Sequence, residues 1–471
     1  MNSKILIICL FVLFYECAAQ PLPPGKISRE AALNDLVIIR KSIEDVHPGL
    51  NRFGQEAGFK VTYDSIRHVI ESQDSIALVA LFRTVNPLFV KVKCGHLKFL
   101  PPQKDFPFYY HQENVLPVIV RFDEQMRLLI VKSVDPAFVG EYIDSINGRS
   151  IASILDILRA NMFVDGDIMA SANAQIQQYF SAWYADFIQE NGSFELVLKN
   201  SSGINKQVNM AGITTENWKK LNVSFKDLSV ENTLTFKSDS VAYLRIAHFY
   251  STTNKAFVKF LDDSFNAIDK KPVKHLIIDV RGNEGGNDRL GKDLYARIAR
   301  NDFKYYDHIE VAARRKKDVT YREMAYIPRF AGLATFFIKK QKDGRLLFRK
   351  HQNLGNHRPK KNAYKGEVSF LVDGLSYSVT SEFLAVAKNE SRGKFIGTES
   401  GGGYSGDNSG TFVIFKLPAS KFDVGLPVAA YYSAVKPPQT PARGIMPDVQ
   451  VLPTASDLLN EEDTILNFAM H

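Results

Sequence analysis

Cysteine is scarce in this sequence, with 3 residues among 471. Cys9 and Cys17 belong to an amino-terminal segment that we expect to be removed, so the remaining chain keeps only Cys94 and has no internal disulfide. Beyond that segment, no stretch approaches the ~20 apolar residues that a membrane helix requires. The sequence therefore argues against a disulfide scaffold and against stable membrane insertion.

Several motifs of common chemistry are also missing. The sequence has no Walker loop and no His-Glu-x-x-His helix, and its 10 histidines lack the paired spacing of metal ligands. A Gly-x-Gly-x-x-Gly match occurs at Gly401, Gly403 and Gly406, but a strand-like segment follows it where a nucleotide site needs a helix. We interpret these glycines as a turn, and no metal or organic cofactor is implied.

The composition is that of a chain that forms a large core. Hydrophobic residues make up 45% and charged residues 23% of the sequence. The net charge is +8, but the basic residues are scattered except in short clusters at 314–317 and 360–361. Nucleic-acid binding needs a concentrated basic patch, so we expect no nucleic-acid partner.

The amino terminus has the pattern of a secretory signal peptide over residues 1–19. Lys4 precedes an apolar run from Ile5 to Tyr15, and small residues follow at Ala18 and Ala19. Cys17 raises the alternative of a lipoprotein anchor, but Glu16 stands where lipoprotein processing requires a small residue. We therefore expect a secreted or periplasmic protein with a cleaved signal.

Three structured regions follow. Residues 26–105 have the apolar spacing of helices, ending in a strand-like segment between Pro87 and Pro101 that contains Cys94-Gly95-His96. Residues 106–212 are rich in strands, with one helix that Ser150 can cap. From about residue 236 to 471, buried strands alternate with helices, which predicts an α/β fold with parallel strands. Within this region, residues 303–365 are interpreted as a basic, aromatic insertion that covers a cleft.

Two strand ends in the last region carry the residues of greatest chemical interest. The strand 273–280 runs into Gly285-Gly286, whose amides can point at an oxyanion, although such glycines are more often an ordinary turn. The strand 368–372 leads to Ser378 at a helix start, where a serine hydroxyl suits a nucleophile. Spacing alone favours the alternative that this serine is a helix cap.

Taken together, these segments resemble the tail-specific, or carboxyl-terminal processing, serine peptidases. The resemblance rests on Asp-x-Arg-x-Asn-x-Gly-Gly from Asp279, Gly-x-x-x-Ser-x-x-Ser-Glu from Gly374, Gly397-Thr398-Glu399, and Gly444-Ile445-Met446-Pro447-Asp448. It implies a ClpP/crotonase-like α/β core. The stretch from Tyr142 to Gly148 is similar to a PDZ turn, which implies that residues 106–212 form a degenerate PDZ-like domain behind an amino-terminal helical segment.

The resemblance also implies roles for individual residues. Ser378 is the expected nucleophile. The branch of the family that uses lysine as the base has a Gly-Lys-Gly-like loop, but this chain has three glycines at 401–403. The tricorn-like branch takes a histidine from an Asp/Cys-Gly-His element, which His96 matches. A packed strand-end histidine would be the interpretation without the serine motif.

The acid that orients the histidine is the weakest match to the family. A glutamate usually precedes Gly-x-x-Pro-Asp, but here Arg443 stands there. We expect Glu399 to take the role, with Glu382 and Asp448 as alternatives. The resemblance assigns the oxyanion hole to the backbone N–H of Val379 and of Gly285 or Gly286.

Three further residues have simpler explanations. Cys94 is expected to be a small buried core residue and not a thiol nucleophile. His47 is expected to end a helix, and His248 either lines the cleft or packs.

The sequence thus predicts a secreted serine endopeptidase that cleaves peptides or unfolded proteins, with carboxyl-terminal tails as one substrate class. A peptide would be captured as an extra strand on the PDZ-like sheet. The alternatives are a non-catalytic binder with the same fold and an esterase.

Overall fold

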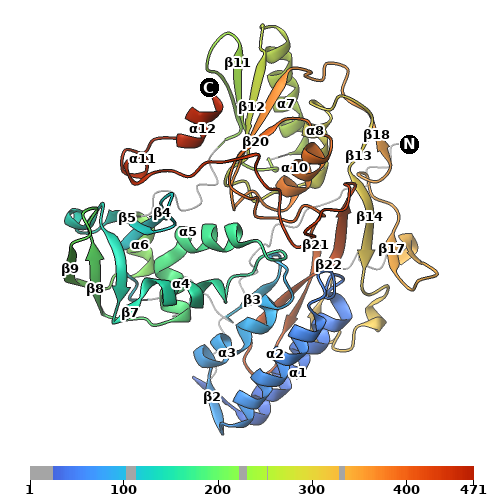
Figure 1. Ribbon diagram of the computed structural model, residues 1–471. Helices are drawn as coiled ribbons and strands as arrows, with labels where there is room; N and C mark the ends of the chain where they lie inside the picture. The colour runs from blue at the N-terminus through green and yellow to red at the C-terminus, as the bar shows by residue number, and fades with distance from the viewer. Residues whose placement is uncertain (1–24, 102–112, 222–230, 252, 328–334) are drawn as a thin grey trace.

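The computed structural model describes residues 25–101, 113–221, 231–251, 253–327 and 335–471. The predicted signal peptide lies outside these residues. Figure 1 shows an amino-terminal helical segment, a β-rich middle module and an α/β core with a parallel sheet, as the sequence predicts. We use "middle module" for residues 113–221 and "core" for residues 231–471.

The amino-terminal segment packs three helices around a buried apolar stripe. These are α1 (Arg29–Val46), α2 (Glu56–Glu71) and α3 (Leu78–Val90), with the short paired strands β1 (Lys26–Ser28) and β2 (Ser75–Ala77) beside them. The Ser28 hydroxyl caps α1 by accepting the N–H of Ala31 at 3.3 Å. Leu36, Ile39 and Ile43 lie on the buried face of α1, as their helical spacing predicts.

One prediction for this segment is wrong. The strand-like segment expected after Pro87 is instead the end of α3, which runs through the proline to Val90. The proline lies in the last turn, where its own carbonyl still accepts the N–H of Lys91 at 3.2 Å, so the helix tolerates the missing donor. Within the predicted strand-like segment, only β3 (Lys98–Leu100) is a strand.

Strand β3 fastens the amino-terminal segment to the far end of the chain. It pairs antiparallel with β22 (Asp423–Ser433), with Phe99 opposite Val424. Strand β22 belongs to an antiparallel sheet of order β15-β21-β22-β14-β17-β16. The other strands of this sheet are β14 (Tyr306–Val311), β15 (Ala325–Tyr326), β16 (Ile338–Lys340), β17 (Leu346–Phe348) and β21 (Asn408–Lys416). The residues just before β3, including His96, are thereby held against the core.

The predicted insertion contributes several of these strands. Strand β14 is an interior strand of the sheet, between β22 and β17, and β15 pairs with β21. A separate two-stranded sheet joins β13 (Phe303–Lys304) to β18 (Asn356–His357). In its described part, the insertion is therefore built into the antiparallel sheet.

The middle module is an antiparallel sheet of order β4-β5-β6-β8-β9, covered by helices. Asn147 and Gly148 form the predicted turn, with φ of +49° and +74°, and the Ser150 hydroxyl caps α4 by accepting the N–H of Ser153. The elements are β4 (Val118–Phe122), β5 (Leu128–Ser133), β6 (Tyr142–Ile146), β7 (Arg149–Ser150), α4 (Ile151–Arg159), α5 (Met169–Phe187), β8 (Ser193–Lys199), β9 (Asn205–Ala211) and α6 (Thr215–Leu221).

The core is a three-layer α/β structure. Its sheet has the order β10-β11-β12-β19-β20-β23, with every pair parallel except β10 and β11. In β12, Leu276 and Ile278 pack under one layer of helices, whereas Ile277 faces the other side with Leu466 of α12. The elements are β10 (Thr233–Phe236), β11 (Val241–Arg245), α7 (Asn254–Asp269), β12 (His275–Asp279), α8 (Asp288–Tyr295), β19 (Glu367–Val372), α10 (Val379–Asn389), β20 (Lys394–Gly397), β23 (Val449–Gln450), α11 (Ala455–Leu459) and α12 (Thr464–Ala469).

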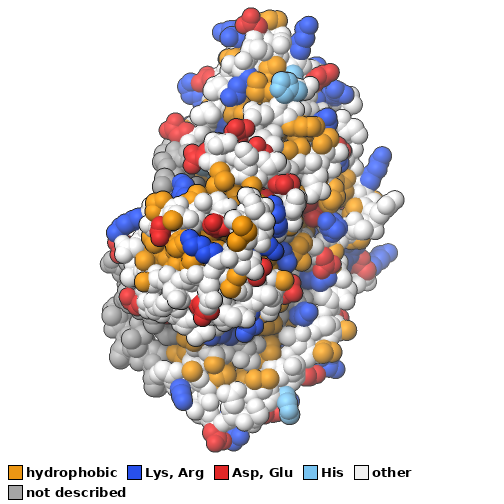
Figure 2. Space-filling view, turned by 60° about the vertical axis from the view of Figure 1, so that its left-hand side comes forward, with side chains coloured by type: hydrophobic (Ala, Val, Ile, Leu, Met, Phe, Trp, Pro, Cys, Tyr) orange, Lys and Arg blue, Asp and Glu red, His pale blue; other side chains and the backbone are white. Residues whose placement is uncertain are grey.

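Two surface properties bear on partners. No helix among the described residues is long and apolar enough to cross a bilayer. On the face that brings the middle module forward, basic and acidic side chains are interspersed (Figure 2). This face therefore lacks the single-sign patch that nucleic-acid binding requires.

Candidate active site

Ser378 occupies a strained position between β19 and α10. Its φ and ψ are +56° and −128°, in a region that residues with a side chain rarely adopt. It stands at the N-cap of α10, yet its side chain makes no capping hydrogen bond. The hydroxyl oxygen lies 3.1 Å from Nε2 of His96 instead. A sharp strand-to-helix turn that exposes a serine hydroxyl is typical of a nucleophile.

The turn before Ser378 is braced by its neighbour after β12. The Asp373 carboxylate accepts the backbone N–H of Gly282 at 2.9 Å and that of Leu375 at 3.0 Å. The N–H of Tyr377 donates to the carbonyl of Asn283 at 3.0 Å. The two strand ends that the sequence singled out therefore meet at one edge of the sheet, as parallel neighbours do.

His96 reaches this edge from the amino-terminal segment. Its neighbours Cys94 and Leu97 are buried, which anchors the segment on both sides of the imidazole. Burial lowers the pKa of His96 to about 4, an effect that nearby Asp407 opposes and Lys98 reinforces. The imidazole is therefore neutral at pH 7 and can accept a proton through Nε2.

The other imidazole nitrogen has a partner that the sequence did not predict. Nδ1 of His96 lies 2.7 Å from the hydroxyl of Tyr377, and the two rings pack with their centroids 4.6 Å apart. The Tyr377 hydroxyl also lies 3.3 Å from Oδ1 of Asp165, which accepts the N–H of Gly95 at 2.9 Å. Asp165 comes from the loop between α4 and α5 in the middle module.

The acids that the sequence proposed for His96 are bonded to other groups. Glu399 is held by the guanidinium of Arg443 through contacts of 2.8 and 2.7 Å, and it also accepts the N–H of Gly444 at 2.8 Å. The expectation that Glu399 orients the imidazole therefore finds no hydrogen bond in its favour among the described residues. The physical reason is Arg443, whose guanidinium pairs with this carboxylate.

The two alternative acids are also occupied. Glu382 accepts the hydroxyl of Tyr306 at 2.5 Å, and burial raises the pKa of this carboxyl well above its usual value. Asp448 pairs with Lys388 and accepts the N–H of Phe395 at 2.8 Å.

The backbone donors around Ser378 are close together. Val379 opens α10, where backbone N–H groups have no acceptor within the helix. A Cβ on Gly285 would lie 2.8 Å from Cβ of Ser378 and 3.0 Å from the nitrogen of Val379, so this approach requires glycine. The N–H of Gly285 is itself bonded to Oδ1 of Asn283 at 2.9 Å. Both glycines therefore stay candidate donors, Gly285 through its closeness to Ser378 and Gly286 because its N–H has no hydrogen bond among the described residues.

The glycines at 401–403 have a packing role. A Cβ on Gly402 would lie 2.2 Å from the hydroxyl of Ser381 and 3.2 Å from the nitrogen of Ser378. The N–H of Gly401 donates to the carbonyl of Ser376 at 2.9 Å. This turn therefore lies directly against the serine loop, and strand β21 follows it, in agreement with the interpretation as a turn.

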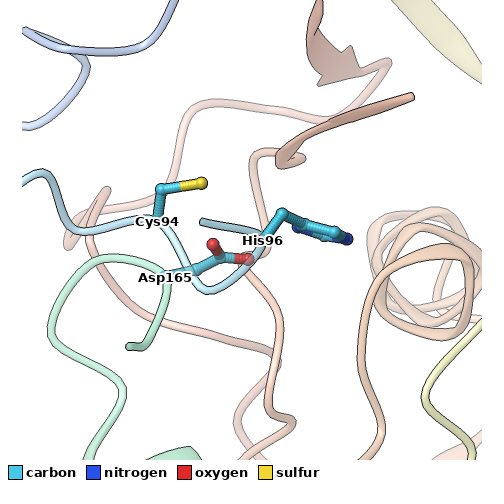
Figure 3. A group of neighbouring side chains, drawn as sticks. All are labelled: Cys94, His96 and Asp165. Atoms are coloured by element: carbon cyan, nitrogen blue, oxygen red, sulfur yellow. The ribbon is translucent and has the colours of Figure 1, made fainter. Parts of the chain in front are cut away.

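Cys94, His96 and Asp165 form a compact group of metal-ligand types, shown in Figure 3. Their donor atoms lie within 4.8 Å of one another. Figure 3 shows the imidazole pointing away from the Cys94 thiol. Because both ring nitrogens already have hydrogen-bond partners, the group does not fit a metal ion.

Cys94 and His47 are inert by their surroundings. Burial raises the pKa of the Cys94 thiol, whose sulfur lies 3.6 Å from the carbonyl of Asn408. Burial lowers the pKa of His47 to about 3, and neither of its ring nitrogens has a hydrogen-bond partner. His248 stacks on Tyr250 with ring centroids 4.0 Å apart.

A serine at the carboxyl end of a buried parallel sheet, facing a neutral imidazole, is an arrangement that serine hydrolases use for acyl transfer. Residues 240–451 match the model of peptidase family S41. The family and enzyme class that the motifs predicted are thereby confirmed.

Solved structures agree with the assignment of the fold. Mature CPAF aligns with a TM-score of 0.64 and 11% identity, covering 94% of this chain and 96% of that one. Mature CPAF complexed with lactacystin aligns with the same TM-score and 12% identity, over 94% and 97% of the two chains. No curated protein sequence matches the chain.

Proposed function

We propose that the protein is a secreted serine endopeptidase in which Ser378 is the nucleophile and His96 the general base. The observation that carries this proposal is the 3.1 Å contact between the Ser378 hydroxyl and Nε2 of His96. If Ser378 were a helix cap, its hydroxyl would accept a backbone N–H from the first turn of α10. Here it is free of the helix, partly exposed, and within proton-transfer distance of a neutral imidazole.

The reaction proceeds in two halves. Ser378 Oγ attacks the scissile carbonyl carbon while its proton moves to His96, and the imidazolium then protonates the leaving amine as the C–N bond breaks. Water attacks the resulting acyl-enzyme, passes a proton to His96, and the proton returns to Ser378 as the acid product leaves. The N–H groups of Val379 and of Gly285 or Gly286 stabilise the oxyanion in both halves, each by about 3 kcal/mol.

Peptide capture by the middle module would use one of its two edge strands, β4 or β9, and β4 is partly occupied. A PDZ-like strand addition needs free backbone groups at an edge. On β4, the carbonyl of Val118 already accepts the Ser181 hydroxyl at 3.1 Å and the Trp218 indole at 2.9 Å. Cleavage at internal peptide bonds, without a requirement for a free carboxyl terminus, is therefore the activity we favour.

A fluorophosphonate probe and casein test the proposal together. The mature protein is expected to form a probe adduct and to cleave casein, and Ser378→Ala and His96→Ala are each expected to lose both reactions. An adduct that persists in Ser378→Ala would refute the nucleophile. Neither labelling nor cleavage would favour a binding protein, and ester cleavage alone would favour an esterase.

Tail dependence has its own test. A peptide with a free carboxyl terminus and its amidated twin are expected to be cleaved at equal rates. A rate that falls at least ~10-fold on amidation would restore the tail-specific interpretation.

Export is part of the proposal because of the predicted signal at residues 1–19. Amino-terminal sequencing of protein recovered from the extracellular or periplasmic fraction is expected to begin just after Ala19. Recovery of an uncleaved chain inside the cell would contradict this.

A further inference from the structure

We propose that Tyr377 and Asp165 position His96, so that a hydroxyl and a carboxylate together take the place of the single orienting acid. This inference rests on the proposed function, because it assigns a role within the same site. Tyr377 precedes the nucleophile, and Asp165 is contributed by the middle module. The chain of contacts runs from Ser378 to His96 at 3.1 Å, to Tyr377 at 2.7 Å and to Asp165 at 3.3 Å.

The hydrogen count along this chain explains how it selects one tautomer. Tyr377 has a single hydroxyl proton. If Asp165 accepts it, the tyrosine oxygen accepts the proton on Nδ1 of His96, and Nε2 is left as the acceptor for Ser378. Without Asp165, the tyrosine can donate to Nδ1, which places the imidazole proton on Nε2 and removes the base. A wrong tautomer of this kind lowers kcat by about 10⁴-fold in a serine peptidase triad.

The contact between the Tyr377 hydroxyl and the His96 imidazole requires that residue 95 has no side chain. A Cβ on Gly95 would lie 2.6 Å from the Tyr377 hydroxyl, so only glycine at this position lets the hydroxyl approach the imidazole. The N–H of Gly95 also donates to Asp165. The glycine before His96 therefore serves the same contact from the opposite side.

Asp165 is fixed in place by its own loop. Its exposed fraction is 2%. The N–H of Gly166 donates to the carbonyl of Lys93 at 3.1 Å, and that of Asp167 donates to the carbonyl of Ala442 at 2.8 Å. Lys93 and Asp167 also form an ion pair at 2.8 Å. The loop therefore connects the segment that carries His96 with the core, and its carboxylate is held next to Tyr377.

The charges around Asp165 make it sensitive to pH. Burial and the neighbouring Asp407 raise the pKa of Asp165 to about 7, while Arg52, the Gly95 amide and the Tyr377 hydroxyl act in the opposite direction. Cys94 and His96 are the other titratable groups that face it. Above this pKa the carboxylate stabilises the imidazolium that forms during attack, and below it that stabilisation is lost.

The first test removes only the tyrosine hydroxyl. Tyr377→Phe is expected to lower kcat on the order of 100-fold with KM nearly unchanged, because the hydroxyl supports proton transfer and does not bind substrate. Tyr142→Phe is the matched control. It removes another hydroxyl that donates to a buried aspartate, Asp123, at 3.0 Å, and kcat is expected to stay at the wild-type level. A kcat for Tyr377→Phe within about threefold of wild type would overturn the proposal.

The second test asks whether Asp165 acts through Tyr377. Asp165→Asn keeps an acceptor for Gly95 but loses the charge, and kcat at pH 8 is expected to fall at least ~10-fold, with the ~10⁴-fold loss of a wrong tautomer as the upper limit. In the Tyr377→Phe background the same change is expected to cause no further loss. Losses that multiply in the double variant would overturn the relay. Asp123→Asn, which removes the charge of another buried aspartate that accepts a tyrosine hydroxyl, is the control, and its kcat is expected to stay at the wild-type level.

The pH dependence of kcat separates this role from a structural one. The wild-type enzyme is expected to lose activity as the pH falls through about 7, and Asp165→Asn is expected to lack that limb. An unchanged limb in Asp165→Asn would contradict the proposal. Failure of the relay is distinguishable from failure of the proposed function, because only the latter leaves probe labelling intact in Ser378→Ala.

Discussion

Glu399 and Asp165 are two buried acids near the same serine, and their surroundings differ in kind. Glu399 has a guanidinium and a backbone N–H for its two oxygens. Asp165 has one backbone N–H and one tyrosine hydroxyl on Oδ1, and Oδ2 has no hydrogen-bond partner among the residues that the structure describes. A fully paired acid contributes to stability, whereas an acid held with too few partners retains a raised pKa and a use for its charge. We therefore assign a stabilising role to Glu399 and a role in the proposed mechanism to Asp165.

The largest effect is expected from breaking the loop that carries Asp165. Gly166 has φ of +57°, and a Cβ there would lie 2.2 Å from the carbonyl oxygen of Ala442. Gly166→Ala is therefore expected to destabilise the fold by about 2 to 4 kcal/mol and to displace Asp165. Urea unfolding and kcat measure the two consequences, and kcat is expected to fall at least ~10-fold.

Gly148→Ala provides the matched control for this change. Gly148 has a similar φ of +74°, but no atom lies within 4 Å of an added Cβ. The variant is expected to lose only about 1 to 2 kcal/mol from backbone strain, with kcat unchanged. Equal losses in the two variants would mean that the Asp165 loop has no special part in the site.

An intermediate effect is expected on stability when the charge of Asp165 is removed. The folded-state pKa of about 7 lies above the unfolded value, so folding takes up a proton between these values. The penalty for the ionised group is absent at low pH and grows as the pH rises to 7. Asp165→Asn is therefore expected to raise the free energy of unfolding on the order of 2 kcal/mol at pH 8 and hardly at all at pH 4.

Urea unfolding at the two pH values, with Asp167→Asn beside it, measures this difference. A variant that loses activity while gaining stability would place Asp165 among residues kept for function. A loss of stability at pH 8 would instead show that the carboxylate is well compensated in the fold, like Glu399.

The smallest effect on catalysis is expected at Glu399. Glu399→Gln weakens the pair with Arg443, whose side chain is partly exposed, and is expected to reduce the free energy of unfolding by about 1 to 2 kcal/mol. The kcat is expected to stay within about twofold of the wild-type value. If kcat falls further here than in Asp165→Asn, the two acids exchange the roles given above.

Much of the fold was predictable because its signals are local. The apolar runs that became β12 and β19 indicated a buried parallel sheet, and these two strands pair in parallel as expected. The passage of α3 through Pro87 was not, because a proline in the last helical turn costs little when the carbonyls around it find other donors.

The candidate site was predictable only where residues follow a motif. Ser378 and His96 are each part of a recognisable element, and the structure brings them together across 282 positions. Tyr377 and Asp165 are joined across 212 positions, and neither belongs to a motif. The substitution of Arg443 for an acid was visible in the sequence, but the residues that compensate for it are defined by tertiary contacts alone.

Because β3 pairs with β22, the proposed active site can be assembled only late in synthesis. His96 and Asp165 are synthesised early, but the strand that seats the histidine segment is made near the end of the chain. On the proposed mechanism, a polypeptide still emerging from the ribosome or the export channel contains His96 and Asp165 but lacks the assembled active site. Synthesis order thus keeps the proposed site incomplete until β22 has been made.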